Sequence, residues 1–441
     1  MKFSSHLTKG TWAMAARGLP AVYAAVNVVL MTVMSKEEFG TFVLFQTINT
    51  ILFTFADNFA FQAIVKFGVE PDMNLQELLS TTSALFLAFA LPVLGLMFLL
   101  SGPLSQVLKN PDLPTLLPSL ALLVLVTAPR VVTYKILQMR FRMREMFFID
   151  LLNYGTSSAV LLILVGQHSI HHAIDVIQVT IVANALSALL GIIIARKEMR
   201  FVPRFSRTTY HRILDFVRYQ SGIGVVSVLQ QQSDSLLVSG FTGPAGLATY
   251  TGAKLFYRGF EIVRDTAALF VFPASSKYHS RGEIATLKRL LEKAVGFLYL
   301  LLVPIGVVLL FAAPFLYHLI YGHKYDASIP VFQVLTAASL VLPLQIVLGT
   351  AIGGIGQVRE AFRITLASFL LNVTIALILL PRIGIIGSAI AFVCGTACQA
   401  ILIYRQIKRT VGFELSGVLS GSIRDTRNFV RELLDRFNSS K

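Results

Sequence analysis

The stretch "GTFVLFQTINTILFTFAD", from Gly40 to Asp57, aligns without gaps with "ATYTGAKLFYRGFEIVRD", from Ala248 to Asp265. The dipeptide Thr41-Phe42 falls on Thr249-Tyr250, and the aspartates that close the two copies coincide. Each copy sits within a segment long enough to cross a bilayer, which takes roughly 20 residues. The repeat therefore predicts two related halves, each built from membrane-spanning helices.

The composition of the whole chain agrees with a membrane location. Of its 441 residues, 55% are hydrophobic and only 14% are charged, and the mean hydropathy is +0.71. Long continuous apolar runs indicate helices, because the strands of a membrane barrel would alternate in hydrophobicity. The apolar run after Lys9 is too long for a cleavable signal peptide, so we expect the first span to act as its own insertion signal.

Twelve spans account for the apolar runs, and the basic residues orient them. The spans are predicted at 12–34, 39–66, 79–100, 114–139, 147–165, 173–195, 213–239, 246–273, 291–313, 328–356, 361–380 and 385–404. With both termini inside, the external loops hold only Lys36, Lys109, Lys324 and Arg382, and the internal loops are strongly basic. The internal loop 67–78 is the exception, because it has no Lys or Arg.

A second repeated motif defines the extent of the halves. "MREMF" at 143–147 matches "VREAF" at 358–362, and each lies between the fourth and fifth spans of its half. We therefore expect an all-helical membrane protein with two parallel six-helix lobes, at 1–204 and 205–404, around a central cavity. The segment 405–441 is predicted as a cytoplasmic tail whose apolar residues share one helical face, as in helices on a membrane surface; a solvated tail is the alternative.

Charged residues are concentrated in the second repeat copy, within the predicted eighth span. Successive helical residues turn by about 100°. This places Lys254, Arg258, Glu261 and Asp265 on one stripe, with Arg264 beside it. Charges at this depth are costly unless they face protein or water, and they commonly mark a substrate or ion pathway. Salt bridges within the span are the alternative explanation, although they leave the first lysine without a local partner.

Other predicted spans extend this set of charges. Its bases are Arg17, Lys66, Arg130, Lys135, Lys254, Arg258, Arg264 and Arg363, and its acids are Asp57, Asp234, Glu261 and Asp265. The excess of bases predicts a cationic cavity for an anionic substrate, and arginine in particular binds phosphate through paired hydrogen bonds. The four acids are candidates for coupling to protons or sodium ions. Charges near span ends, including Asp150, are given little weight because they can reach interfacial water.

The remaining motifs indicate no other chemistry. Cys394 and Cys398 lie four residues apart in an apolar helix, so we expect core residues rather than a metal or redox pair. The histidines 168, 171 and 172 cluster in a predicted external loop, which favours a polar surface over a metal site. The sequence has no P-loop and no glycine-rich nucleotide fingerprint, so we expect no cofactor. Topology rather than nucleic acid binding explains the formal charge of +15.

Three stretches resemble polysaccharide transporters of the multidrug/oligosaccharidyl-lipid/polysaccharide exporter superfamily. A first span leads to the acidic turn "KEEFG" at 36–40 and a second span. "QQQSDSLLVSGFTGPAGLATYTGAKLF" at 230–256 is similar to the start of the family's second half, and "LPRIGIIGSAIAF" at 380–392 to its glycine-rich last span. The resemblance covers residues 9 to about 410.

The resemblance implies a function that agrees with the charge pattern. Members of the polysaccharide branch flip polyprenyl-pyrophosphate-linked oligosaccharides across the bacterial inner membrane, for O-antigen, capsule or exopolysaccharide synthesis. Two lobes rocking by alternating access would carry the anionic sugar-pyrophosphate head through the cavity while the lipid tail stays in the bilayer. A polysaccharide polymerase and glycosyltransferases are the implied partners, and the implied role is transport rather than catalysis.

Three alternatives stay open at this stage. A multidrug/cation antiporter of the same superfamily often has an acid in its first span, whereas this first span contains Arg17 and no acid. A lipid II flippase also has a cationic cavity, but that resemblance implies fourteen spans. A membrane glycosyltransferase or polysaccharide polymerase usually carries a sizeable loop outside the membrane, and the predicted external loops are short.

Overall fold

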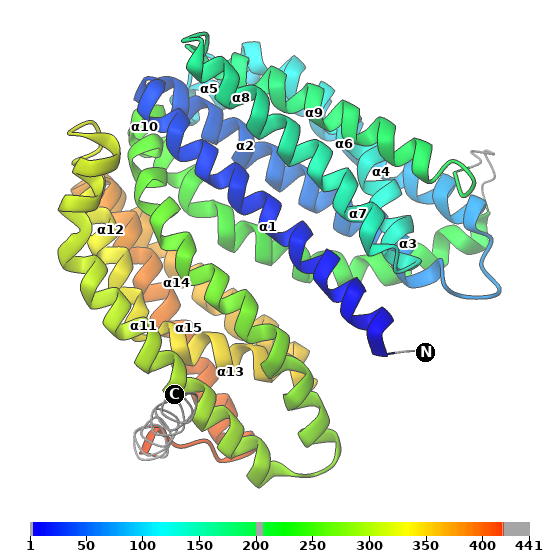
Figure 1. Ribbon diagram of the computed structural model, residues 1–441, viewed down its shortest axis with the longest axis vertical. Helices are drawn as coiled ribbons and strands as arrows, with labels where there is room; N and C mark the ends of the chain where they lie inside the picture. The colour runs from blue at the N-terminus through cyan, green and yellow to red at the C-terminus, as the bar shows by residue number, and fades with distance from the viewer. Residues whose placement is uncertain (1–2, 200–205, 417, 419–441) are drawn as a thin grey trace, which may run out of the picture. The chain divides into compact units, whose positions relative to one another are not determined.

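The structure is a computed structural model that describes residues 3–199, 206–416 and 418. All regular elements within these ranges are helical (Figure 1). The chain forms two compact units, Met1–Thr251 and Gly252–Lys441, which are described separately. The predicted lobes meet instead at residues 204 and 205, and that division stays a prediction based on the repeat.

The first unit is built mainly from helices that pack around α6 and α9. Its elements are α1 (Phe3–Val33), α2 (Lys36–Ala56), η1 (Asp57–Phe61), α3 (Gln62–Phe67), α4 (Leu75–Leu99), α5 (Ser101–Val107), α6 (Leu113–Met139), α7 (Met143–Asp150), η2 (Leu151–Gly155), α8 (Thr156–Gly166), α9 (Ala173–Ile194) and the first part of α10 (Arg207–Ser280). Helix α6 packs against α9, and α2 contacts both. Stacked aromatic rings such as Phe61 and Phe86, 5.0 Å apart, fill the space between α4 and the end of the second span.

The second unit continues α10 and adds the remaining helices. They are α11 (Ile284–Tyr321), α12 (Ser328–Thr336), η3 (Ala337–Leu340), α13 (Leu342–Gly354), α14 (Val358–Ile383) and α15 (Ile385–Val411). Helix α15 packs against α12, α13 and α14. Near the start of the unit, the Tyr317 hydroxyl donates to the Gly252 carbonyl at 3.1 Å, and the Phe256 ring lies 4.9 Å from the Tyr317 ring.

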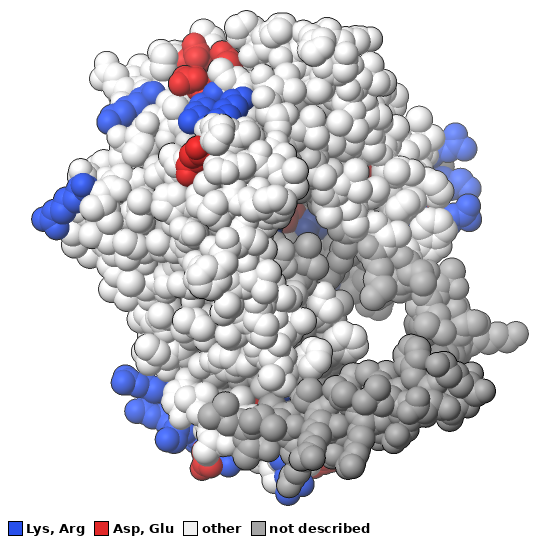
Figure 2. All heavy atoms as spheres, turned by 60° about the vertical axis from the view of Figure 1, so that its left-hand side comes forward, with Lys and Arg blue, Asp and Glu red and all other residues white. Residues whose placement is uncertain are grey.

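Apolar side chains cover much of the outer surface. In α4 the most apolar window has a mean hydropathy of 2.2, yet only 28% of it is buried. Exposed large side chains in that helix include Leu91, Leu96 and Leu99. Most of the described surface visible in Figure 2 carries neither acidic nor basic residues. A helix that is apolar all round but buried on one side only is suited to lipid as its outer solvent.

Within the first unit, the connections sort into two groups as the predicted topology requires. Residues on the predicted external side contact one another: Lys109 Nζ donates to the Phe241 carbonyl at 2.7 Å, and Asn110 Nδ2 donates at 3.0 Å to Thr41 Oγ1, near the external end of the predicted second span. On the predicted internal side, Arg142 pairs across loops with Glu198 at 3.6 Å. An alternating in-and-out path of the chain produces this sorting. Which group faces the cytoplasm stays a prediction.

The acidic loop 67–78, the exception to the charge pattern, has a basic partner from elsewhere in the chain. Arg212, at the start of α10, bonds Glu70 at 2.6 Å and Asp72 at 3.0 Å. The hydrogen bond from Arg212 lowers the pKa of the Asp72 carboxyl. A cation that is distant in sequence therefore supplies the charge that this loop lacks.

The helices agree with most predicted spans. Each predicted range overlaps a helix, and eight helices in the described residues are long and apolar enough to cross a membrane. A bent pair, Ser328–Leu340 and Leu342–Gly354, would make a ninth. The predicted seventh and eighth spans form one element, α10, which is interrupted at Gly243 by a φ of 73° that glycine adopts without strain.

Several helices extend beyond the predicted spans, and the last helix is an example. Helix α15 continues past the predicted span end at residue 404 to Val411, through the first residues of the predicted tail. The helix ends at Gly412, whose left-handed φ of 73° is the common C-terminal stop, and Lys408 and Arg409 in the last turn complement the helix dipole. The amphipathic segment predicted further along, at 419–441, lies outside the described residues.

Close backbone packing at Gly40 gives a first prediction. A Cβ at this position in α2 would overlap the backbone carbonyl of Pro244, which directly follows the break in α10. We expect Gly40→Ala to destabilise the protein by about 1–3 kcal/mol, because neither backbone can move freely. Apparent melting temperature in detergent is the measurement. Gly95→Ala is the matched control, since a Cβ there meets nothing within 4 Å, and equal melting temperatures of both variants would contradict the packing.

The contact between the starts of α2 and α9 predicts a pH dependence. Glu38 accepts from the Ala173 amide at 2.6 Å and lies 3.1 Å from His172 Nδ1. The hydrogen bond to Glu38 raises the pKa of His172 above its ordinary 6.5. The stabilisation from this pair is therefore complete below pH 6.5 and disappears as the pH rises through the raised pKa of the folded state.

Melting curves from pH 5.5 to 9 check this dependence. The difference in melting temperature between wild type and His172→Asn should be largest at the acidic end and shrink as the pH rises. His171→Asn, at the exposed neighbouring position, should show no such trend. A difference that grows with pH would show that the sign is wrong.

Candidate functional site

A polar cavity of about 300 Å³ lies inside the first unit. Its lining comes from α1, α2, α6, η2, α8 and α9 and consists of Tyr23, Gln46, Asn49, Thr50, Phe53, Thr54, Leu123, Thr127, Arg130, Asn153, Tyr154, Ser157, Thr180 and Asn184. The volume is roughly ten times the ~30 Å³ of one water and sits at the lower end of the range of ligand pockets. Amides and hydroxyls dominate this lining, which is unusual inside an apolar protein.

Arg130 is the charged group of the cavity wall. Its NH2 lies 2.8 Å from Asp150 Oδ1, its NH1 donates to Asn184 Oδ1 at 3.4 Å, and its guanidinium lies 5.7 Å from the centre of the Tyr154 ring. The arginine and Asp150 side chains are 13% and 10% exposed. Asp150 is therefore buried and paired, which corrects the expectation that it reaches interfacial water. The pairing offsets much of the cost of placing both charges at this depth.

Several buried polar atoms of the lining have no protein partner. They include Asn49 Oδ1, Asn153 Oδ1 and Arg130 Nε. A buried polar atom without a hydrogen bond costs about 1–3 kcal/mol. These atoms belong to residues that line the cavity, and Tyr23 and Tyr154 add aromatic rings to the same lining.

The described part of the first unit contains two π-helical segments, one of which contributes residues to the cavity lining. Segment η1 begins at Asp57, and η2 contains Asn153 and Tyr154. A π-helical turn adds one residue to the local register, and such turns are frequent at functional sites. In η2 the added residue lies in the same five-residue segment as Asn153 and Tyr154, which both line the cavity.

Lys135 and Asp57 form a second ion pair in this unit. Lys135 Nζ lies 3.0 Å from Asp57 Oδ2, which also accepts from Gln62 Nε2 at 2.9 Å. The lysine and aspartate side chains are 11% and 19% exposed. Neither residue lines the polar cavity, and the central cavity predicted for the bases stays a prediction.

The predicted residues of the second unit have different surroundings. Lys254 is half-buried, whereas Arg258 and Arg264 are exposed. Arg363 is 72% exposed and pairs with Glu360 at 2.7 Å in the first turn of α14. The side chains of Arg17, Glu261 and Asp265 lie outside the described residues. The predicted stripe on α10 therefore stays a prediction.

Asp234 is the remaining predicted acid. It is 3% exposed and accepts from the Tyr250 hydroxyl at 2.9 Å and from the Ser235 amide at 2.8 Å. Tyr250 follows the break at Gly243, so this contact joins the two parts of α10 within the first unit.

Sequence reasoning missed the neutral part of the site. Gln46, Asn49, Asn153 and Asn184 carry the cavity's amide groups, and all four lie in predicted spans. Their signal in the sequence is the presence of asparagine and glutamine inside apolar runs, where each amide needs a partner. A search restricted to charged residues passes over it.

A second cavity, of about 290 Å³, has an apolar lining. Its walls come mainly from α4 and α6 and include Leu79, Phe86, Leu125 and Val132. It has few polar groups to orient a ligand, so the first cavity is the stronger candidate for recognition.

Solved structures with the same fold are membrane transport proteins. The lipid II flippase MurJ in an inward closed conformation superposes with a TM-score of 0.75 over 96% of this chain and 93% of its own, at 15% identity. An inward-facing multidrug resistance MATE family transporter of the MOP superfamily superposes with a TM-score of 0.70 over 91% of this chain and 98% of its own, at 14% identity. Together with the apolar helices, these likenesses define a multi-pass membrane protein with the fold of that superfamily.

The sequence narrows this class further. The chain matches the polysaccharide biosynthesis protein family over residues 7–330 and belongs to that family, which confirms the predicted resemblance. The membrane protein MJ1068 of Methanocaldococcus jannaschii, itself uncharacterized, is 22% identical over 266 residues, covering 56% of this chain and 52% of the relative. The probable low-salt glycan biosynthesis flippase Agl15 of Haloferax volcanii is 22% identical over 138 residues, covering 31% and 29%. The chain thus spans about half of the first relative and less than a third of the second.

The Lys135–Asp57 pair generates a prediction about stability. We expect Lys135→Met to destabilise the protein by about 3–5 kcal/mol, because it leaves the aspartate charge buried and uncompensated. Adding Asp57→Asn should restore most of the loss, since the amide still accepts from Gln62. Unfolding in a series of detergents, from mild to harsh, gives the differences in unfolding free energy between wild type and the variants.

An exposed pair supplies the control for this experiment. Arg363→Met breaks the pair with Glu360 and should cost only about 0–1 kcal/mol. A double variant that is no more stable than Lys135→Met would show that the buried charge is not the cause.

Proposed function

We propose that this protein flips a lipid-linked oligosaccharide, with a polyprenyl-pyrophosphate carrier, across the membrane for surface polysaccharide synthesis. The polar cavity of the first unit is the observation that carries the proposal. Family membership and the flippase relative support it, and so does a fold found in both a lipid II flippase and multidrug transporters.

The chemistry of the cavity suits part of a sugar head group. A sugar ring presents hydroxyls that both donate and accept, and the cavity is lined mainly by amides and hydroxyls, with the Arg130 side chain in its wall. The rings of Tyr23 and Tyr154 add flat, amphipathic surfaces. An apolar cation would leave these amides and hydroxyls unsatisfied, which disfavours the multidrug alternative.

The other predicted groups keep their roles in the proposal. Lys254, Arg258 and Arg264 would contact the pyrophosphate, and alternating access of the two lobes would move the head group. Coupling to H⁺ or Na⁺ would use an acid such as Asp57 or Asp234. The proposal gives the chain no catalytic role. The bacterial inner membrane, the O-antigen, capsule or exopolysaccharide pathway, and the partner polymerase and glycosyltransferases stay predictions from the resemblance.

Flipping in proteoliposomes tests the proposal. The purified protein is reconstituted with a polyprenyl-pyrophosphate-linked trisaccharide, and the sugar that becomes accessible to an impermeant oxidant is followed over time. We expect wild type to accelerate flipping, and Asn153→Leu or Asn49→Leu to slow it about five- to tenfold, from about 1–1.5 kcal/mol per lost hydrogen bond. Neither substitution strands a protein partner, so melting temperatures should stay close to wild type.

The variant Asn27→Leu is the matched control. Asn27 Oδ1 is also buried without a partner, but Asn27 does not line the cavity. It should flip the glycolipid at the wild-type rate. Absence of flipping by wild type would overturn the proposed function, whereas normal flipping by Asn153→Leu and Asn49→Leu would overturn only the role of the cavity.

A further inference from the structure

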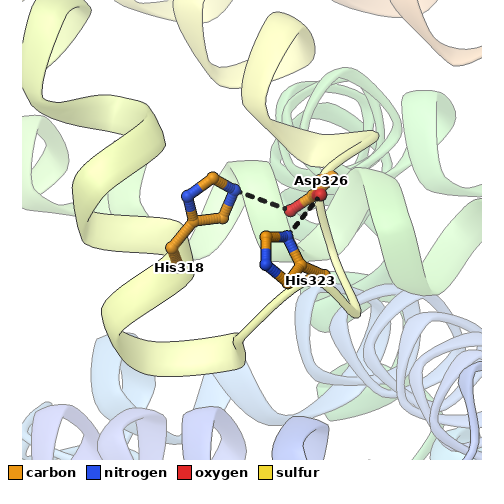
Figure 3. A group of neighbouring side chains, drawn as sticks. All are labelled: His318, His323 and Asp326. Carbon is orange, nitrogen blue, oxygen red and sulfur yellow. Dashed lines mark hydrogen bonds and ion pairs between the residues drawn. The ribbon is translucent and has the colours of Figure 1, made fainter.

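Two histidines and an aspartate converge at the end of α11 in the second unit. His318 projects from the last turn of that helix, and His323 and Asp326 come from the connection to α12, in the stretch "HLIYGHKYD" (Figure 3). His318 Nε2 lies 3.1 Å from Asp326 Oδ1, and His323 Nδ1 lies 3.1 Å from Asp326 Oδ2. Both rings therefore point toward the same carboxylate.

The connection holds these side chains in place. Gly322, with a φ of 59°, ends α11 and turns the chain, and its amide donates to the His318 carbonyl at 3.0 Å. Tyr325 is fully buried, and its ring lies 5.1 Å from that of Tyr321. The buried tyrosine anchors the connection between its two ligand-bearing residues, so the group is positioned before anything binds.

The geometry resembles a set of metal ligands. One ligand atom from each residue can be chosen so that all three lie within 4.8 Å of one another. Ligand atoms around a tetrahedral zinc ion, with bonds of about 2.0–2.1 Å, lie roughly 3.3 Å apart. Each imidazole nitrogen lies 3.1 Å from a different oxygen of Asp326, which is close to this spacing. Binding of one ion by both imidazoles and a single carboxylate oxygen would need a small movement of these side chains.

The donor types select the class of metal. Imidazole nitrogen suits zinc and the later first-row transition metals, whereas magnesium and calcium prefer all-oxygen sets. The side chains are 43%, 84% and 46% exposed in chain order, so an ion can enter from solvent and keep water on its open positions. Lys324 lies beside the group with its ammonium 5.8 Å from the Tyr325 ring, and it would weaken binding without blocking it.

We infer that His318, His323 and Asp326 form a binding site for a divalent transition metal ion, with Zn²⁺ as the best match. The ion would take the place of the protons that the imidazoles now share with the carboxylate. It would tie the end of α11 to the connection that leads into α12. This site is separate from the polar cavity and independent of the proposed transport function.

Metal titration of the full-length protein tests this inference. The protein is purified without a histidine tag, treated with a chelator, and titrated with Zn²⁺ while its melting temperature is followed. Co²⁺ then replaces Zn²⁺, and its visible absorption reports coordination by nitrogen and oxygen ligands. We expect one metal ion per chain, a higher melting temperature with Zn²⁺, and at least a tenfold loss of affinity in His323→Ala and in Asp326→Asn.

These variants should fold normally, because the substituted side chains are exposed; that of His323 is 84% exposed. His171→Ala removes another exposed histidine, from the first unit, and should bind Zn²⁺ like wild type. The inference is wrong if Zn²⁺ does not raise the melting temperature of the wild-type protein. It is equally wrong if affinity is unchanged in both ligand variants, because the three residues would then only brace the connection through hydrogen bonds.

Discussion

Charge buried in an apolar, membrane-embedded unit needs a partner, and this requirement organises the first unit. Arg130 with Asp150, and Lys135 with Asp57, each place one base against one acid at 2.8 and 3.0 Å. In both pairs the base lies on α6. The acids lie on elements that contact α6, Asp150 at the end of α7 and Asp57 at the start of η1. Two ion pairs therefore hold helix α6 in place. The polar cavity forms beside the first of these pairs along the sequence, at Arg130, whose Nε has no protein partner.

Much of the fold could be predicted from the sequence, because hydropathy and the backbone freedom of glycine are properties of a local stretch of the chain. The apolar runs give the helices, and the "GFTGPAG" connection contains the break at Gly243. The loop 67–78 could not be understood in this way, since its cation, Arg212, comes from α10. Contacts between loops of the same side agree with the alternation that the basic residues predicted.

The candidate site was less predictable, because it depends on which charges meet. A helical wheel shows which residues share a face, but not that Arg130 faces Asp150 or that Lys135 faces Asp57. The bases were predicted to surround a central cavity between the lobes, which stays a prediction; within the first unit, Arg130 lines the polar cavity and Lys135 does not. Neutral amides complete the lining. For Asn49 and Asn153, only the folded structure shows that the amide oxygen has no protein partner.

The π-helical turn in η2 links helix register to the chemistry of the cavity. Leu151–Gly155 holds one residue more than an α-helical path would need, and Asn153 and Tyr154 lie inside it. If the π-helical turn shifted to another position along the helix, each side chain in the segment would rotate by about 100° around the helix axis. The amide and the ring would then leave the cavity while the rest of α8 kept its place. The contribution of η2 to this cavity, one amide and one aromatic ring of the lining, thus depends on the position of a single inserted residue, a variable that a helix can change without moving as a body.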